Sequence, residues 1–278
     1  MVRKAMSLKC LQSTTPPPME PLLARLRTEL RALLADNGPE PTPSVRDLCF
    51  ILGMVAVATV VVATNHYGVP RLAGILSRSM PPGVLADPRR TFWAGLVAVV
   101  YTVPPLIYCR LFVPDVRRSL GLTPTRVRSA VRLWVVFALC AVPLLTMLST
   151  LPGFRSTYPM ARGNMADPMS MTVWLLAYGL QFVGLELFFR GFLLLVPRRI
   201  LGIWGLAVML LPYAMLHFSK PPLETIGSVG FGLMLGILAF RSRSIVDGIG
   251  MHLILAFTLE LLALGPALRA SLPWSAGG

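Results

Sequence analysis

The 278-residue sequence has few charged residues and very few acidic ones. Charged side chains make up 14% of the chain and hydrophobic ones 55%, with 12 Asp or Glu against 26 Lys or Arg. A soluble domain usually carries about 25% charged residues, so this chain could not cover its surface with polar groups in water. The basic residues lie in short clusters between apolar runs and not on one face, so we expect no nucleic-acid partner.

Cysteine is also scarce. The sequence contains no Cys-x-x-Cys pair, and its cysteines are Cys10, Cys49, Cys109 and Cys140. The last three lie at or within apolar runs, where cysteine is a small hydrophobic packing residue. We therefore expect neither a disulfide framework nor a thiolate metal site, and we predict no cofactor and no bound metal.

Long apolar runs dominate the rest of the sequence. They cover residues 48–64, 91–109, 133–151, 171–196, 200–218, 225–240 and 245–264. A bilayer core needs about 20 helical residues per crossing, so most of these runs are long enough to span it, although 225–240 is short. Helices are required because an open sheet in lipid would leave backbone groups unpaired. The predicted fold class is all-α, a polytopic transmembrane helix bundle of about seven spans, or eight.

Residues 21–36 differ from these runs. Leucines recur there at helical spacing among charged residues, and Asn37-Gly38 provides a stop. We predict an N-terminal amphipathic helix that lies against anionic headgroups, or else an ordinary solvated helix packed on the body. No cleavable signal peptide is evident, because the proline-rich stretch Ser13–Pro18 follows the basic N-terminus.

The basic residues predict an orientation. With the N-terminus inside, 17 Lys or Arg fall on the inner side and 8 on the outer side. By the positive-inside rule we expect a cytoplasmic N-terminus and a C-terminus on the opposite side. The predicted location is the cell membrane, as a multi-pass protein of the bacterial inner membrane.

Four polar residues lie in or at the ends of apolar spans, where they are costly and need a reason. Glu186 and Arg190 are four residues apart, hence on one helix face, and can pair. His217 ends the fifth run, and His252 lies about two turns inside the seventh. Taken singly, the ion pair could serve helix packing and His217 could be interfacial. Together they form an acid–base array in hydrocarbon, suited to proton transfer.

Three motifs in this order resemble the CAAX-protease and bacteriocin-processing family of glutamic-type intramembrane proteases. The family's Glu-Glu-x-x-x-Arg motif is Leu185-Glu186-Leu-Phe-Phe-Arg190 here. Its Phe-x-x-x-His motif is matched by Tyr213 and His217. Its His-x-x-x-Asn or Asp motif is matched at His252 alone, because Ala256 fills the last place.

The resemblance covers roughly residues 170–260. It implies a protease core at 171–264. Charge and apolar runs predict a basic cytoplasmic segment at 1–46, transmembrane helices at 47–170 and a short tail at 265–278.

The resemblance also implies roles for the array. The catalytic residues would be Glu186 as general base, His217 positioning the water or sharing its proton, His252 stabilising developing negative charge, and Arg190 holding Glu186 ionised. The first family glutamate, usually considered the catalytic one, is Leu185. Either Glu186 has taken over the base role or catalysis is lost. Ala256 removes one oxyanion donor.

The predicted function is thus an intramembrane endopeptidase that hydrolyses a membrane-anchored protein or peptide substrate in the lipid bilayer. A further stretch, His217-Phe-Ser-Lys220-Pro-Pro-Leu-Glu224, resembles bacterial members proposed to cleave C-terminal sorting signals, although Lys220-Pro221-Pro222 is also an ordinary turn. The alternatives are an inactive membrane binding or immunity protein, a zinc protease with Glu186, His217 and His252 as ligands, and a proton-coupled transporter. The sequence does not determine the oligomeric state.

For the array to assemble, the chain must break between the fourth and fifth spans. With a simple hairpin at Pro197, Glu186 and His217 would lie at different depths. We therefore predict that residues 197–202 run along the membrane interface and that the fifth span begins near Ile203 or Trp204. Pro197-Arg198-Arg199 favours such a break.

Overall fold

The computed structural model describes residues 43–123 and 126–271 and, before them, Ala24 and Thr28. By its internal contacts the chain divides after Gly38 into two units, and the helices named below belong to the second. The predicted N-terminal amphipathic helix lies outside the described residues except for Ala24 and Thr28, which are helical.

Every regular element among the described residues is a helix, which confirms the predicted all-α class. In chain order the elements are α2 (Val45–Ala63), η1 (Thr64–Gly68), α3 (Val69–Ser79), α4 (Pro88–Phe112), α5 (Val116–Ser119), α6 (Val127–Leu148), α7 (Pro152–Thr157), η2 (Arg162–Ala166), α8 (Pro168–Glu186), η3 (Leu187–Leu195), α9 (Arg198–Leu201), η4 (Gly202–Trp204), α10 (Gly205–Met215), α11 (Pro222–Ser242) and α12 (Val246–Ser271). Within the described ranges, seven helical stretches are long and apolar enough to cross a membrane, as the sequence predicts.

The first of these stretches is longer than the sequence predicts. In place of a span over 48–64 and then a loop, α2 continues through η1 and α3 as one helical stretch to Ser79. Between α2 and α3, η1 is a five-residue π-helical stretch, a widened turn that continues the helix without ending it. Pro70 falls in the first turn of α3, where a missing N–H costs little. The polar residues of η1 and this proline are typical of a turn, which explains the wrong expectation.

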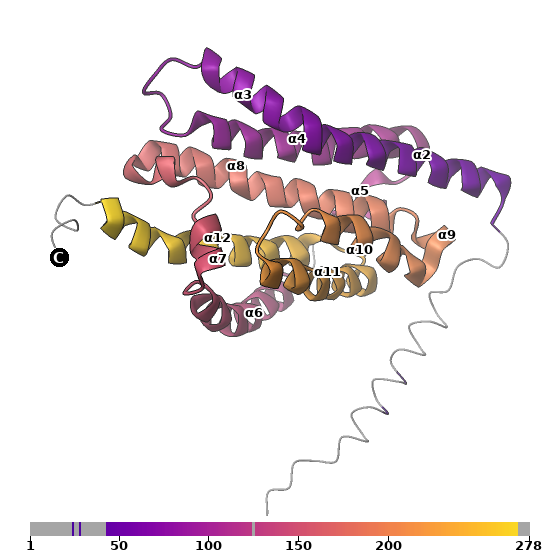
Figure 1. The fold of residues 1–278 in the computed structure, drawn as a ribbon. Helices are drawn as coiled ribbons and strands as arrows, with labels where there is room; N and C mark the ends of the chain where they lie inside the picture. Colours follow the sequence, from indigo (N-terminus) through magenta and orange to yellow (C-terminus); the bar gives the residue numbers. More distant parts are fainter. Residues whose placement is uncertain (1–23, 25–27, 29–42, 124–125, 272–278) are drawn as a thin grey trace, which may run out of the picture. The chain divides into compact units, whose positions relative to one another are not determined.

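The spans alternate in direction, so their connections gather at two ends of the bundle (Figure 1). At the end where α2 begins, Arg199 Nη2 lies 3.0 Å from Asp47 Oδ1, and Ile245 N donates to Gly121 O. We call this the Asp47 end. At the other end, which we call the Asp87 end, Asp87 N donates to the side chain of Asn164, at 2.6 Å.

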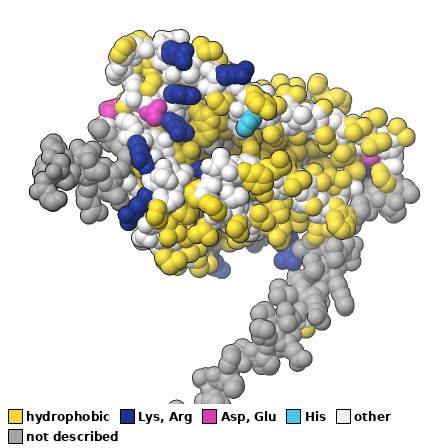
Figure 2. Space-filling view, viewed as in Figure 1, with side chains coloured by type: hydrophobic (Ala, Val, Ile, Leu, Met, Phe, Trp, Pro, Cys, Tyr) yellow, Lys and Arg dark blue, Asp and Glu magenta, His cyan; other side chains and the backbone are white. Residues whose placement is uncertain are grey.

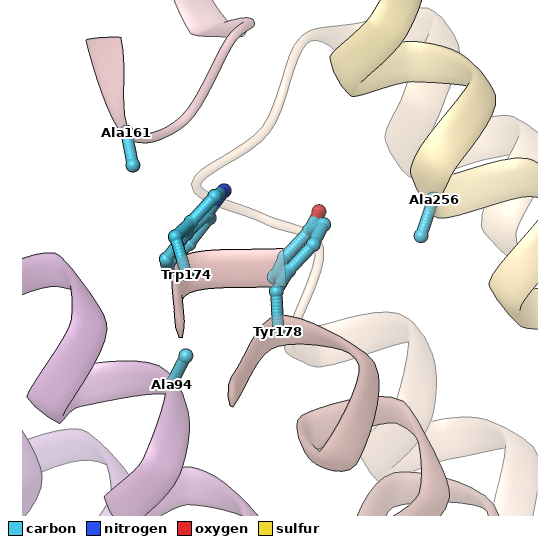
Figure 3. Packing of buried hydrophobic residues seen from close by; sticks show 5 residues of the cluster. All are labelled: Ala94, Ala161, Trp174, Tyr178 and Ala256. Carbon is cyan, nitrogen blue, oxygen red and sulfur yellow. The ribbon is translucent and has the colours of Figure 1, made fainter. Parts of the chain in front are cut away.

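Helix α8 lies at the centre of the bundle and packs most extensively on α4. The two backbones approach closely at Gly184, where an added Cβ would lie 2.9 Å from Ala98 O. Towards the Asp87 end, α4, α8 and α12 contribute to one buried apolar cluster, drawn in Figure 3. In it the rings of Trp174 and Tyr178 stack at 4.8 Å, and the Ala256 methyl lies across from Tyr178.

The break after η3 occurs where the sequence predicts it. Pro197 caps the one-turn α9, Gly202 has a φ of +53°, and α10 begins at Gly205, next to the expected start. A residue with a side chain would be strained at such a φ, and glycine is not. The break makes α10 short, with 11 residues, and α10 packs on η3 and α11.

The outer surface is mostly apolar, as expected of side chains that face lipid. On the face shown in Figure 2, hydrophobic side chains cover most of the area, and most Lys and Arg gather towards the left, the Asp87 end. The span that begins with α2 and the span formed by α6 are the most exposed. In each of them only 11% of the 18-residue apolar segment is buried inside the protein. These two helices therefore form part of the expected lipid-facing shell.

Candidate active site

A buried ion pair joins Glu186, the last residue of α8, to Arg190 in η3. Glu186 Oε1 lies 3.1 Å from Arg190 Nη1, and both side chains are fully buried. Because the two residues are four apart on a continuous helix, they share one face, as the sequence predicts. Arg190 also lies 4.3 Å over the ring of Tyr213 from α10, and its Nη2 donates to Gly232 O of α11. The ion pair thus fastens four elements together.

His252 joins this pair from α12. Its Nδ1 lies 2.8 Å from Glu186 Oε1, and its ring packs between Phe182 and Phe231. With Nδ1–H donated to the carboxylate, Nε2 is the nitrogen left for another partner. The carboxylate therefore fixes both the tautomer and the orientation of the ring, which is how an acid commonly acts on a catalytic or metal-binding histidine.

Glu186 itself is enclosed. A Cβ added at Gly248 of α12 would lie 2.8 Å from Glu186 Oε2, so that the α12 backbone covers this oxygen. Only a residue without a side chain allows the two helices to come so close. Glu186 is 0% exposed and does not line the neighbouring cavity, whereas Leu185 does.

A cavity of about 760 Å³ lies beside this buried cluster. Its wall includes the four positions where the family motifs have their other polar residues, here Leu185, His217, His252 and Ala256. From His252 the cavity extends to exposed residues at the Asp87 end, including Arg89, Arg90 and Ser156.

His217 reaches the cavity from the connection after α10. Its Nδ1 lies 3.0 Å from Tyr213 O, one helical turn back, so Nδ1–H donates to this carbonyl and Nε2 remains an acceptor. Burial lowers the pKa of His217 below the 6.5 of a free imidazole, although the Tyr213 carbonyl and the Glu224 carboxylate both raise it. The imidazole is therefore neutral at pH 7 and has a lone pair to offer.

The four predicted site residues thus fall into two groups. His217 and His252 line the cavity, while Glu186 and Arg190 lie buried behind His252. Among the described residues, no group of three or more His, Cys, Asp or Glu could hold a metal ion. The ligand set that the zinc alternative needs is therefore not assembled in the described part of the chain.

Sequence reasoning missed or misjudged two carboxylates near the cavity. Glu260, near the end of the last apolar run, is buried, and its side chain accepts hydrogen bonds from Met160 N and Trp174 Nε1. Its carboxylate pairs with a backbone N–H of the segment before η2, and no local sequence pattern indicates this partner. Glu224, noted only as part of a motif, lines the cavity beside Lys220.

Replacing Glu186 with glutamine should destabilise the protein by about 3 kcal/mol or more. The change leaves the Arg190 guanidinium buried without its counter-charge, and breaking a buried pair in this way is strongly destabilising. Thermal unfolding in detergent micelles measures the effect.

Arg199→Gln is the matched control for this change, because it breaks an ion pair whose arginine side chain is 71% exposed. It should cost less than about 1 kcal/mol. Equal losses of stability in the two variants would contradict the structural role of Glu186.

A family model matches the part of the chain that contains these residues. The family model described as "Type II CAAX prenyl endopeptidase Rce1-like" matches residues 167–258, from the residue that caps α8 into α12. No curated protein and no solved structure matches the chain. The matched range contains Glu186, Arg190, His217 and His252. The chain therefore carries an Rce1-like domain at residues 167–258, and this is a family of CAAX prenyl endopeptidases, which are peptidases.

Proposed function

We propose that the protein is an intramembrane endopeptidase that hydrolyses a peptide bond of a membrane-anchored protein segment in the 760 Å³ cavity. The observation that carries the proposal is that two imidazoles from separate elements line one cavity, and that a buried carboxylate orients one of them. Structural histidines would have no need to meet at a cavity. Peptide hydrolysis needs a held water and a stabilised oxyanion, and two imidazoles can supply both.

In this mechanism the two histidines have different tasks. His217 accepts a hydrogen bond from the attacking water at Nε2, because its Nδ1 is occupied by Tyr213 O. His252, held by Glu186, donates from Nε2 to the oxygen of the scissile carbonyl when its ring is protonated. As negative charge develops on that oxygen, the Glu186–His252 pair stabilises it.

Glu186 and Arg190 are positioning residues in this proposal. The general-base role expected for Glu186 requires contact with the water, but its side chain lies behind His252 and under the α12 backbone. Its carboxylate instead accepts from His252 Nδ1 and orients the ring, and Arg190 holds the carboxylate in place.

We further propose that the site faces the side of the membrane opposite the cytoplasm. The cavity extends to the Asp87 end, whereas the Asp47 end follows directly on the basic N-terminal segment. The positive-inside rule places the Asp47 end in the cytoplasm. A substrate anchored in the inner membrane of a bacterium would then be cut at its outer side, which suits a C-terminal sorting signal.

Cysteine labelling tests this orientation. In a chain whose four native cysteines are alanine, Ser156→Cys places a thiol at the cavity mouth, and Ser129→Cys places one near the Asp47 end. In intact cells a membrane-impermeant maleimide should label Ser156→Cys and should label Ser129→Cys only after permeabilisation. The reverse pattern would contradict the orientation.

Cleavage itself is tested with the full chain in liposomes of phosphatidylethanolamine and phosphatidylglycerol. The probes are single-span test proteins, each tagged at both ends and differing in the residues next to the span. We expect at least one to be cut once near its span. A panel that stays intact would instead support the binding alternative, which the apolar Leu185 and Ala256 at the cavity wall favour.

A further inference from the structure

The proposed hydrolysis does not yet say whether His217 or a carboxylate takes the proton of the attacking water. An attacking water must lose a proton, and the family places a carboxylate for this task at position 185, where this chain has leucine. Glu186 cannot reach the cavity, because it is fully buried and covered by Gly248. The acceptor must therefore be sought among the other groups of the cavity wall.

Two carboxylates of the described residues line the cavity, Asp87 and Glu224. Asp87 has a structural task, since its Oδ1 accepts from Arg90 N as the N-cap of α4. Glu224 has no such task at the start of α11, where Pro221 is the N-cap and no side chain caps the helix.

One carboxylate oxygen of Glu224 accepts a hydrogen bond and the other has no partner. Oε1 accepts the hydroxyl hydrogen of Tyr158 at 2.9 Å and lies 3.6 Å from Lys220 Nζ. Oε2 is buried and has no hydrogen-bond partner. A buried carboxylate oxygen without a partner is costly and is expected where another group completes the site. Glu186 Oε2 also has no partner, but of these two glutamates Glu224 is the one that lines the cavity.

The surroundings hold the Glu224 side chain in place. Lys220 donates to Tyr158 as well and lies 4.8 Å over its ring, so the three side chains hold one another. Burial raises the pKa of Tyr158, which therefore remains a donor. Glu224 also lies in the first turn of α11, where the helix dipole favours negative charge.

Glu224 and His217 belong to one wall of the cavity. The Thr225 hydroxyl, in the residue after Glu224, donates to His217 O and ties the first turn of α11 to the connection that carries His217. Both side chains line the same space. A water held by His217 therefore occupies the cavity that Glu224 also lines.

We propose that Glu224 is the catalytic base of this site and takes over the task of the carboxylate missing at position 185. The inference rests on the proposed function. The water oxygen forms a bond to the scissile carbonyl carbon while its proton passes to Glu224 Oε2. The tetrahedral intermediate then breaks its C–N bond, and the Glu224 carboxyl returns the proton to the leaving amine. One water is consumed, and the products are a carboxylate and an amine.

The test compares Glu224→Gln with Asp87→Asn in the reconstituted full chain, using the tagged single-span test protein that the wild type cuts best. Glutamine keeps an acceptor for Tyr158 but cannot take a proton. We expect Glu224→Gln to lower the cleavage rate by about 10²-fold or more. Asp87→Asn keeps a capping side chain and should stay within a few-fold of wild type. Thermal unfolding of both variants checks that they are folded.

A second-site variant separates a catalytic role from a structural one. If Glu224 replaces the missing carboxylate, then Leu185→Glu should restore cleavage to the Glu224→Gln chain, even though it repairs none of the contacts to Tyr158 and Lys220.

A Glu224→Gln chain that cleaves within about threefold of wild type would overturn the assignment, and so would a loss that Leu185→Glu leaves unchanged. In either case the proposed function stands, with His217 as proton acceptor. A wild type that cuts no test protein overturns the proposed function, and this assignment with it.

Discussion

Replacing His252 with glutamine should lower the rate of substrate cleavage by about 10²–10³-fold, because the protonated ring that the proposal places at the scissile carbonyl is lost and oxyanion-site donors contribute in this range. Glutamine is of similar length but cannot carry the positive charge of the protonated imidazole ring. Because the substrate is held by the rest of the cavity, the loss should fall on kcat more than on KM. The rate is measured with the full chain and a tagged single-span substrate in liposomes.

The matched control is His66→Gln. His66 is exposed in η1, its ring contacts Tyr67 edge-on, and it does not line the cavity. We expect it to leave the rate unchanged. If both histidine variants lose activity equally, the effect comes from the membrane fold and not from the site. If His252→Gln remains as active as wild type, its place in the mechanism is wrong.

Introducing a glutamate at Leu185 should raise the cleavage rate by about 10²-fold in the otherwise wild-type chain. Leu185 is buried and lines the cavity. Because His217 and His252 line the same cavity, the new carboxylate faces the space that they share. A positioned general base contributes about 10²–10⁴-fold, and a second one adjacent to the imidazoles should recover part of this range.

The control for this change is Leu255→Glu, which puts a carboxylate at another apolar position of the cavity wall. A rise in both variants would mean that any added charge admits more water or substrate. A folded Leu185→Glu chain with an unchanged or lower rate would contradict the view that a carboxylate at position 185 faces the space shared by the two imidazoles.

Much of the fold follows from the sequence because lipid leaves few alternatives. Apolar runs of sufficient length must be helices, and seven of them are found. The pairing of Glu186 with Arg190 also follows, since a spacing of four puts both on one face. The continuation of the first span to Ser79 does not follow, because polar residues and a proline resemble a turn.

The chemistry of the site depends on information that no local pattern contains. Leu185 and Glu186 are neighbours, but successive residues of a helix point about 100° apart, so only the packing of α12 shows which one meets the cavity. Glu224 becomes a candidate only because the fold places it in the wall of the cavity that His217 also lines. Neither the orientation of Leu185 nor the position of Glu224 can be predicted from neighbouring residues. The same holds for the hydrogen bond between Tyr158 and Glu224, which are 66 residues apart.

Hydrolysis in water enriched in ¹⁸O tests the central claim most directly. The full chain and a tagged single-span substrate are incubated in such water, and the two fragments are measured by mass spectrometry. We expect one ¹⁸O in the new C-terminal carboxylate, at a single bond in or next to the span, and a product yield that falls by about 10²-fold or more with His252→Gln. Equal yields from wild type and His252→Gln, or an intact substrate in both, would contradict the claim that this cavity is a peptidase site.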